Sequence, residues 1–461
     1  MRSLFILPIV VLLIGGCSLA PNYVAPENDL PEESRDALSI DETWWRGFND
    51  ADLNEIINEA LERNYDLAIA AGNVARARAA LGLARAQQYP NFAVSGEGKR
   101  TWKRDPQDSS KFIDADSFGL SGVLSYEIDL WSKLSDGKKS ALSQLFAMEA
   151  TRETVRLSLI SGAIESYYSL LALTYSERDI AEMLQGKERA YELRKSQARV
   201  GALTELILSQ VAANLNGTKA QLIEIKRQKE AAQNAFFVLL GRSPKAIFEN
   251  GAKLNDRFPS TTLPSAHLPS DLILRRPDIK AAEEGLKASN YSIGAARAQY
   301  LPSISLTGSA GFQSAELGDL FKQESQSAQA GISINLPLLS FGRIGAQVDA
   351  AEAAKEVAIA QYQKSVATAF SEVKDALSRR EQAAARLAQL KEQTAYLGRA
   401  LKLTREQYEA GYSDYIAVID AETDLLAAQI NLNAAQAENV AAQVELYKAL
   451  GGGYKVDDEK D

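Results

Sequence analysis

The stretch FGLSGVLSYEIDL, from Phe118 to Leu130, alternates regularly between apolar and polar side chains. The apolar positions are Phe118, Leu120, Leu124, Tyr126, Ile128 and Leu130, and the polar positions are Ser121, Ser125, Glu127 and Asp129. A period of two predicts a β-strand with one apolar face and one hydrated face. At ~3.3 Å per residue, roughly 13 residues reach about 40 Å, enough to cross a bilayer at the tilt of a barrel strand.

Three further segments alternate in the same way, which makes two pairs of such strands. We expect strands at about residues 91–103, 118–131, 303–313 and 327–338. One face of each segment carries Phe, Leu, Ile or Val, and the other carries residues such as Ser, Thr, Gln, Asn or Glu. This pattern is typical of barrel strands that face lipid on one side and water on the other.

The composition narrows the possible function classes. The chain has 461 residues and a formal net charge of −9, which argues against a nucleic-acid partner. One His and one Cys exclude most metal sites and every Cys/His or Ser/His catalytic scheme that needs a second such residue. We interpret His267 as an ordinary surface residue in a Pro-rich stretch, and Glu127 and Asp129 as residues that line a pore. We therefore expect no enzyme activity, no metal and no cofactor.

The N-terminus has the form of a bacterial lipoprotein precursor. Arg2 and an apolar run from Leu4 to Ile14 fit a signal peptide, residues 1–16, that is too short to span a membrane. Ile-Gly-Gly-Cys at positions 14–17 resembles a lipobox, which makes Cys17 the expected site of lipid attachment. Two or three acyl chains would suffice to anchor the protein. Residues 17–50 then read as a lipidated N-terminal tether, and no later apolar run is long enough for a transmembrane helix.

Long helical patterns fill the rest of the chain. An Ala-rich helix, about residues 66–88, precedes the first strand, and a helical pattern of some 60 residues, about 136–199, follows the second. A helix of that length measures roughly 90 Å. It ends at Val200-Gly201-Ala202, where Gly suits a left-handed helix end, and a returning helix follows from about Glu205.

The second half of the chain repeats the first at an offset of about 210 residues. ARAQQYPNFAVSG from Ala84 matches ARAQYLPSISLTG from Ala296, and Val200-Gly201 matches Ala410-Gly411. Each half reads helix, two strands, long helix, returning helix. We therefore predict a tandem duplication, with a first repeat at residues 51–260 and a second at 261–461.

Several segments together resemble the TolC-like outer-membrane factors, and most closely their lipoprotein branch of the OprM/NodT type. These segments are CSLAPNYVAP, WWRGFNDADLNEIINEAL, YPNFAVSG, LSYEIDLWSK, LPSDLILRRPDI, YLPSISLTG, LPLLSFGRI and AGYSDYIAVIDAETDL. The resemblance implies an α+β membrane protein: a trimer with a 12-stranded transmembrane β-barrel, four strands per chain, continuous with a long periplasmic α-helical barrel. It also implies docking, through a periplasmic membrane-fusion adaptor, to an inner-membrane pump, often of the resistance-nodulation-division type.

The strand count gives an independent reason to expect a trimer. A sheet in a bilayer must close, because an open edge leaves amide groups unsatisfied in hydrocarbon. Two chains would supply eight strands, a barrel that its own side chains fill, whereas three supply twelve and leave a lumen. A homotrimer is thus the smallest assembly that conducts.

Two sets of residues are candidate functional sites. The turns at Val200, Gly201 and Ala202 and at Gly411, Tyr412 and Ser413 form the expected periplasmic tip and adaptor contact. Ile416, Asp420, Thr423 and Asp424 follow the second turn at helical spacing, which puts Ile416 and Asp420 on one helix face. In outer-membrane factors the carboxylate at the position of Asp420 narrows the entrance and favours cations. The resemblance therefore makes these four residues the expected periplasmic gate, although Ala417 stands where some relatives have a second acid.

The sequence thus favours an outer-membrane exit duct of a tripartite efflux system, which passively exports small molecules such as drugs. The alternatives are a duct for metal-ion efflux or for type I protein secretion, and a structural periplasmic coiled-coil lipoprotein. The last has no use for four membrane-length alternating strands. The sequence does not identify the exported substrate.

Overall fold

The computed structural model describes residues 18–27, 40–108, 110–249, 254, 257–259 and 275–454. The expected signal peptide, the expected lipid-attachment residue Cys17, and His267 lie outside these residues, as does part of the expected tether. Among the described residues, no helix has both the length and the apolar character needed to cross a membrane.

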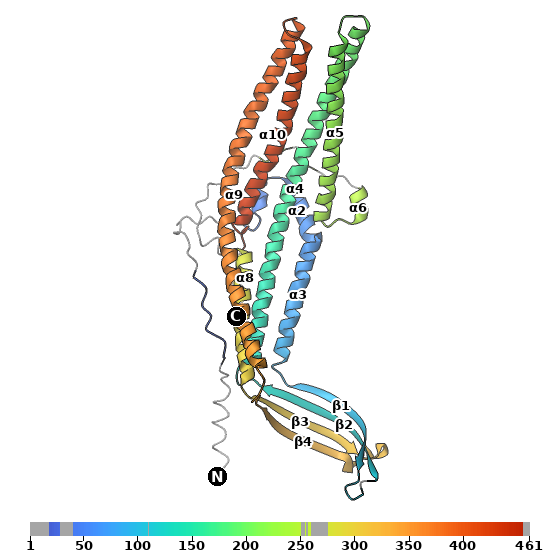
Figure 1. Cartoon of the computed structure of the whole chain (residues 1–461), viewed down its shortest axis with the longest axis vertical. Helices are drawn as coiled ribbons and strands as arrows, with labels where there is room; N and C mark the ends of the chain where they lie inside the picture. Colours follow the sequence, from blue (N-terminus) through green and yellow to red (C-terminus); the bar gives the residue numbers. More distant parts are fainter. Residues whose placement is uncertain are drawn as a thin grey trace. The chain divides into compact units, whose positions relative to one another are not determined.

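The described elements follow the order expected from the sequence (Figure 1). They are η1 (Trp44–Phe48), α2 (Ala51–Arg63), α3 (Tyr65–Ala86), β1 (Asn91–Arg104), β2 (Phe112–Ile128), α4 (Lys133–Arg199), α5 (Glu205–Leu239), α6 (Pro244–Glu249), α8 (Pro277–Arg297), η2 (Ala298–Tyr300), β3 (Ser303–Ser314), η3 (Leu317–Asp319), η4 (Gln323–Ser325), β4 (Gln326–Asn335), α9 (Arg343–Glu409) and α10 (Tyr415–Ala449).

The long helices of the two halves of the sequence have the same lengths. The long helices α4 and α9 each contain 67 residues, and the returning helices α5 and α10 each contain 35. The chain nevertheless packs as two compact units that mix the repeats. Unit 1 comprises residues 1–28, 73–149 and 281–363, and unit 2 comprises residues 29–72, 150–280 and 364–461. The expected repeats therefore describe the internal symmetry of the chain, whereas each unit takes residues from both repeats.

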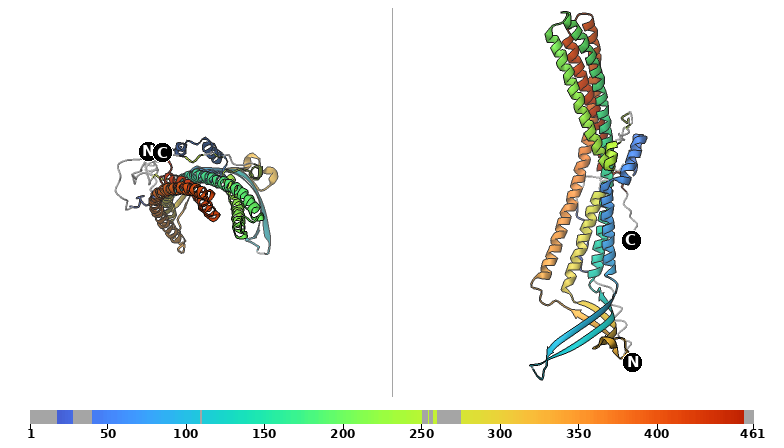
Figure 2. Two further views of the ribbon diagram at one scale, coloured as in Figure 1. Left: turned by 90° about the horizontal axis from the view of Figure 1, so that it is seen from above. Right: turned by 90° about the vertical axis from the view of Figure 1, so that its right-hand side faces the viewer.

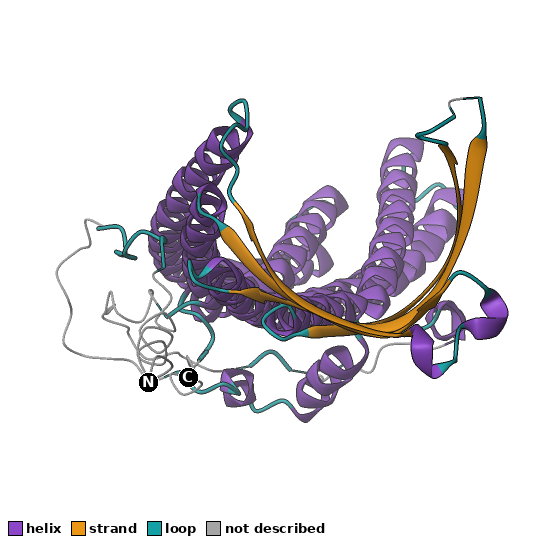
Figure 3. Cartoon of the chain, turned by 90° about the horizontal axis from the view of Figure 1, so that it is seen from below, coloured by secondary structure: helices purple, strands orange, loops and turns teal. Residues whose placement is uncertain are grey.

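Unit 1 contains one antiparallel sheet in the order β1-β2-β3-β4. The register places Tyr126 beside Leu306 and Leu306 beside Ile332, which forms an apolar row across three strands. The adjacent row contains Glu127, Ser305 and Ser333 and is polar. Figure 3 shows that the sheet curves strongly, with β1 and β4 at its two edges. The sheet therefore has the two chemically different faces expected of a barrel wall.

Three strands lie close to their expected bounds, and β2 differs most. β2 starts at Phe112, earlier than the expected residue 118, and Phe112 pairs with Arg104 of β1. The guanidinium of Arg100 binds the carboxylate of Asp116 across the two strands. Polar residues before residue 118 therefore continue the pairing of β1 with β2. β2 also ends at Ile128, earlier than expected, because Asp129 turns to cap α4.

The residues that follow Cys17 form a leader strap, residues 18–27, bound to α4 and α8 within unit 1. The Oγ atom of Ser18 donates to Oδ2 of Asp136 at 2.7 Å, and Nδ2 of Asn290 donates to the carbonyl of Pro21 at 2.7 Å. Gly294 gives the strap room, since a Cβ atom there would lie 2.7 Å from the backbone nitrogen of Ala20. The strap is therefore held by a fitted surface.

Unit 2 contains two long helical hairpins, α4 with α5 and α9 with α10, whose turns lie at the same end of the unit (Figure 1). Seen along the helices, the hairpins form an open arc (Figure 2). At the opposite ends of α5 and α10, the side chains of Asn64 and Arg276 donate to the carbonyls of Leu239 (2.8 Å) and Ala449 (3.0 Å). These bonds satisfy helix-end carbonyls at corresponding places in the two repeats.

Aromatic residues fill the base of the hairpins in unit 2. Trp44 stacks on Tyr447 with ring centroids 4.4 Å apart, and Phe48 packs against Tyr168. Tyr168 and Phe237 are fully buried. This core joins the middle of α4 to the C-terminal ends of α5 and α10, and the hairpins extend from it toward their turns.

Candidate functional site

The two turns at the end of unit 2 have the same backbone geometry. Gly201 has φ +75° and Gly411 has φ +80°, the left-handed region that favours Gly. The N–H of Gly201 donates to the carbonyl of Ala198, and that of Ala202 donates to Gln197; Gly411 and Tyr412 repeat these bonds to Tyr408 and Gln407. These two hydrogen bonds form a Schellman motif, which ends each long helix.

The turns expose apolar side chains. Val200 is 78% exposed and Tyr412 is 89% exposed, and both are much larger than the glycines beside them. The next helices start differently, since the side chain of Thr204 accepts from the N–H of Ile207, whereas the carboxylate of Asp414 accepts from that of Ala417 at 3.0 Å. The two tips therefore share a shape but differ in charge.

The expected gate residues lie together on α10. Asp420, Thr423 and Asp424 are exposed and Ile416 is half-buried, one turn before Asp420. Thr423 also contacts α5, since Nδ2 of Asn214 donates to its Oγ1 atom at 3.2 Å. Within the described part of the chain, neither Asp420 nor Asp424 forms an ion pair. α10 therefore presents a stripe of uncompensated negative charge just beyond the turn.

A buried arginine joins the two hairpins behind this stripe. The guanidinium carbon of Arg194 on α4 lies 4.1 Å from the ring centroid of Tyr415 and 4.9 Å from that of Tyr408. The two rings pack edge to face, 5.2 Å apart. Burial raises the pKa of the Tyr415 hydroxyl, and the charge of Glu422 adds to the effect. Cation–π contacts of a desolvated arginine tie α4 to both helices of the second hairpin.

Two further charged groups are buried one or two turns farther from the tip. Glu422 of α10 accepts a hydrogen bond from Nη2 of Arg405 at 2.7 Å, and Lys187 of α4 donates to Oγ1 of Thr218 at 2.9 Å. Burial lowers the pKa of Lys187, although the charge of Glu422 opposes the shift. Each of the four long helices contributes one member to this group. Buried polar groups that are all bonded fix one arrangement of the helices.

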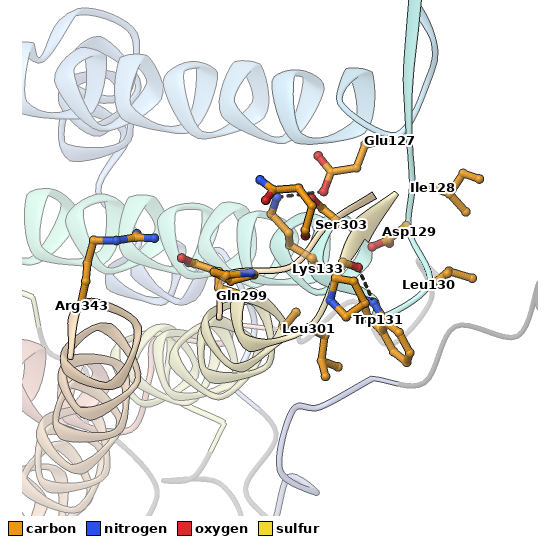
Figure 4. Close-up of a pocket in the computed structure, with 14 residues that line it drawn as sticks. Glu127, Ile128, Asp129, Leu130, Trp131, Lys133, Gln299, Leu301, Ser303 and Arg343 are labelled. Atoms are coloured by element: carbon orange, nitrogen blue, oxygen red, sulfur yellow. Dashed lines mark hydrogen bonds and ion pairs between the residues drawn. The ribbon is translucent and has the colours of Figure 1, made fainter. Parts of the chain in front are cut away.

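In unit 1, a cavity of about 180 Å³ lies where the sheet meets the helices. Figure 4 shows the ion pair between Lys133 and Glu127, whose Nζ and Oε1 atoms are 2.9 Å apart. Asp129 accepts from the N–H groups of Leu134 and Ser135, and the indole of Trp131 donates to the carbonyl of Pro302. Glu127 and Asp129 therefore serve to join strand and helix, in addition to any role in lining a lumen.

The structure brings together the tip and gate residues chosen from the sequence, with both turns at one end of unit 2. The sequence reasoning missed the buried charges of Arg194, Lys187 and Glu422 and the exposed Arg405 that pairs with Glu422. The one available signal was the pair of tyrosines, Tyr408 and Tyr415, that flank Gly411 seven residues apart. Among the described residues, no cluster of three metal-binding side chains occurs.

Comparison with known proteins agrees with this architecture. A family model described as outer membrane efflux protein matches twice, at residues 56–242 and 268–452. The antibiotic efflux pump outer membrane protein ArpC of Pseudomonas putida is 31% identical, over 98% of this chain and 96% of its own. The cation efflux system protein CusC of Escherichia coli K12 is 33% identical, over 96% of this chain and 98% of its own. The double match follows the predicted duplication.

Solved structures show the same fold. The CmeC outer membrane channel of Campylobacter jejuni superposes with a TM-score of 0.89 at 29% identity, and each chain is covered to 96%. The open state of the MtrE outer membrane channel of Neisseria gonorrhoeae gives a TM-score of 0.82 at 30% identity, covering 96% of this chain and all of that one. The fold class expected from the sequence is confirmed.

Proposed function

Because this chain belongs to the outer membrane efflux protein family, we propose that it is the exit duct of a tripartite efflux system. It works as a homotrimer in the outer membrane and extends into the periplasm. A periplasmic adaptor connects it to an inner-membrane pump. The duct is passive: the pump selects and drives the substrate, and the channel gives it a path across the outer membrane.

The observation that carries this proposal is the open sheet. The four strands have one apolar and one polar face, and among the described residues β1 and β4 have no strand on their outer edges. Three copies close such a sheet around a water-filled lumen. The charged groups at the strand–helix junction are engaged in structural bonds, which supports a channel without catalysis.

We assign the periplasmic entrance to the α10 stripe. In a trimer, Asp420 and Asp424 would place three copies of each carboxylate around the axis, where they would attract cations and repel one another. A pair of such charges repels by about 1 kcal/mol in water-like dielectric, so the apolar Ile416 helps to hold the mouth closed. The Val200 and Tyr412 tips are the surface for the adaptor, because both side chains are apolar and exposed.

The lipid anchor is Cys17. It precedes the leader strap directly, and the strap itself is bound by unit 1. Mass spectrometry of the mature N-terminus would show acylation at Cys17, and an unmodified thiol would contradict the assignment. Cys17→Ala, exported with a cleavable signal peptide, would still form trimers, because the barrel is the larger membrane contact.

The relatives export different substrates: the names above include an antibiotic efflux protein and a cation efflux protein at similar identity. We therefore propose small molecules as the substrate class, with a metal ion as the second candidate, favoured by the acidic stripe.

The channel assignment is tested in planar bilayers. Purified trimers should form cation-favouring channels, and the double variant Ile416→Ala/Asp420→Ala should raise single-channel conductance and reduce cation selectivity. The matched control is Leu206→Ala/Gln210→Ala at the corresponding positions of the first repeat, which should change neither. If neither the unaltered trimer nor the double variant conducts ions, the assignment as a duct is wrong. If the unaltered protein and all variants conduct alike, the gate lies elsewhere.

A further inference from the structure

The loop between β4 and α9, residues 336–342, exposes large apolar side chains at the helical end of the sheet. Leu338 is 87%, Leu339 74% and Phe341 90% exposed. Residues 332, 334 and 336 follow the lipid-facing alternation of β4, but the strand ends at Asn335 and the loop no longer alternates. The lipid-facing pattern of the strand therefore does not account for this patch.

The backbone of the same loop is in an uncommon conformation. Phe341 has φ +47° and Gly342 has φ +85°, so an aromatic residue occupies a region that bulky side chains rarely adopt. A residue is held in such a conformation when its surroundings determine it. Here the turn itself supplies that constraint, because the N–H of Arg343 donates to the carbonyl of Ser340 at 3.0 Å. The turn presents the ring of Phe341 outward, with almost no cover in the single protomer.

Strand topology identifies the neighbour. β4 is antiparallel to β3, β3 to β2 and β2 to β1, so β4 runs opposite to β1. In a closed ring of copies, β4 of one protomer pairs antiparallel with β1 of the next. The last residues of β4 then lie beside the first residues of the neighbour's β1, which starts at Asn91.

The start of β1 carries its own exposed apolar residues. Leu83 near the end of α3 is 64% exposed, Tyr89 is 71% and Phe92 is 67%. We propose that the loop of residues 336–342 packs on this surface of the next protomer and forms an apolar clasp where sheet and helices meet. The clasp rests on the trimeric duct proposed above, and it names residues of the contact between neighbouring protomers. Each protomer gives the loop on one side and receives a loop on the other.

Disulfide cross-linking tests the clasp in outer-membrane trimers. On oxidation of Phe341→Cys/Tyr89→Cys, at least half of the chains should become cross-linked. They should run as covalent dimers and trimers in boiled, non-reduced samples. The single variants report any coupling through Cys17 and should give none. The control Phe341→Cys/Phe112→Cys places the second thiol at the far end of β2, with a similarly exposed parent residue, and should also give none.

A second measurement separates a protein neighbour from lipid. A membrane-soluble maleimide should label Phe341→Cys at least tenfold less than Ile332→Cys, a lipid-facing position that is 70% exposed in the protomer. Equal labelling would place Phe341 in lipid and overturn the clasp. Trimers are scored separately in unboiled gels: normal trimers without cross-links also overturn the clasp while leaving the duct intact, and loss of trimers in every chain, including the unaltered one, contradicts the duct itself.

Discussion

The hydroxyl of Ser18 lies 2.7 Å from Oδ2 of Asp136, a carboxylate with no solvent exposure in the first turn of α4. Nζ of Lys139 approaches the other oxygen at 3.4 Å. The residue that follows the candidate lipid-bearing Cys17 is thus part of a buried contact, and the start of the leader strap is fixed to unit 1.

Removing this carboxylate should release the leader strap. Loss of a hydrogen bond to a buried charged group costs about 1–3 kcal/mol, which raises the local opening constant roughly 5- to 150-fold. Hydrogen exchange of the peptide covering residues 19–27 should be faster by this factor in Asp136→Ala. Asp66→Ala is the control, because Asp66 also lies in a helix first turn but is exposed. Unchanged exchange in Asp136→Ala would show that the strap is held elsewhere.

The leader strap should also open at alkaline pH. Burial raises the pKa of Tyr23 from 10.0 to about 12, with a further contribution from Glu283 and an opposing one from Lys287. The folded strap favours the neutral phenol, so this stabilisation is complete below pH 10 and is lost as pH rises from 10 to about 12. After correction for base catalysis of the intrinsic exchange rate, the strap should lose protection in that window, and Tyr23→Phe should abolish this loss of protection. Tyr65→Phe, at an exposed tyrosine, should leave it in place.

Bulky residues at the turn glycines should block efflux without preventing assembly. Gly201→Leu or Gly411→Leu forces a side chain into positive φ, at a cost of roughly 1–2 kcal/mol, while the space around the new Cβ atom is open. Trimers should persist in unboiled gels, and drug accumulation assays should show lost export. Gly398→Ala, in open space on a regular helix, should behave as the unaltered protein. Loss of trimers in the leucine variants would mean that the turns serve folding alone.

Gly241 has the same turn geometry in different surroundings and should respond differently. Its φ is +69°, but a Cβ atom there would overlap the carbonyl of Arg63. Gly241→Ala should therefore reduce the amount of folded protein in the membrane, measured against Gly201→Ala.

Breaking the ion pair between Arg405 and Glu422 should loosen the second tip. The carboxylate is 10% exposed and the guanidinium 52%, so Arg405→Ala leaves a largely buried charge and costs about 1–3 kcal/mol after allowance for solvent at Arg405. We expect a lower melting temperature and higher single-channel conductance. Replacing both partners by Leu should recover most of the melting temperature; a double variant no more stable than Arg405→Ala would contradict this reading.

The fold was predictable to the extent that it depends on local pattern. Alternation located the four strands, and Gly201 and Gly411 located the turns, because positive φ has a strong residue preference. The start of β2 was missed, because cross-strand pairing of Arg100 with Asp116, rather than local polarity, decides how far the hairpin extends.

The site was predictable on the surface and not in the interior. Ile416 and Asp420 could be placed on one face by helical spacing alone. Arg194 and Tyr415 are more than 200 positions apart, and no pattern in either helix indicates their contact. Which buried charges meet depends on how the hairpins pack, and that information is not local.

The two edge strands, β1 and β4, determine how the trimer assembles in the membrane. A single chain in lipid leaves the outward backbone groups of β1 and β4 without a described strand partner, and an open dimer still leaves two such edges. Only the closed ring has none, so partial assemblies gain little until the last chain arrives. Insertion and oligomerisation are therefore one cooperative event, and an exposed edge that waits outside the membrane is a template for aggregation. Cells that overproduce the chain should accumulate closed rings and aggregates, with no stable dimer between them.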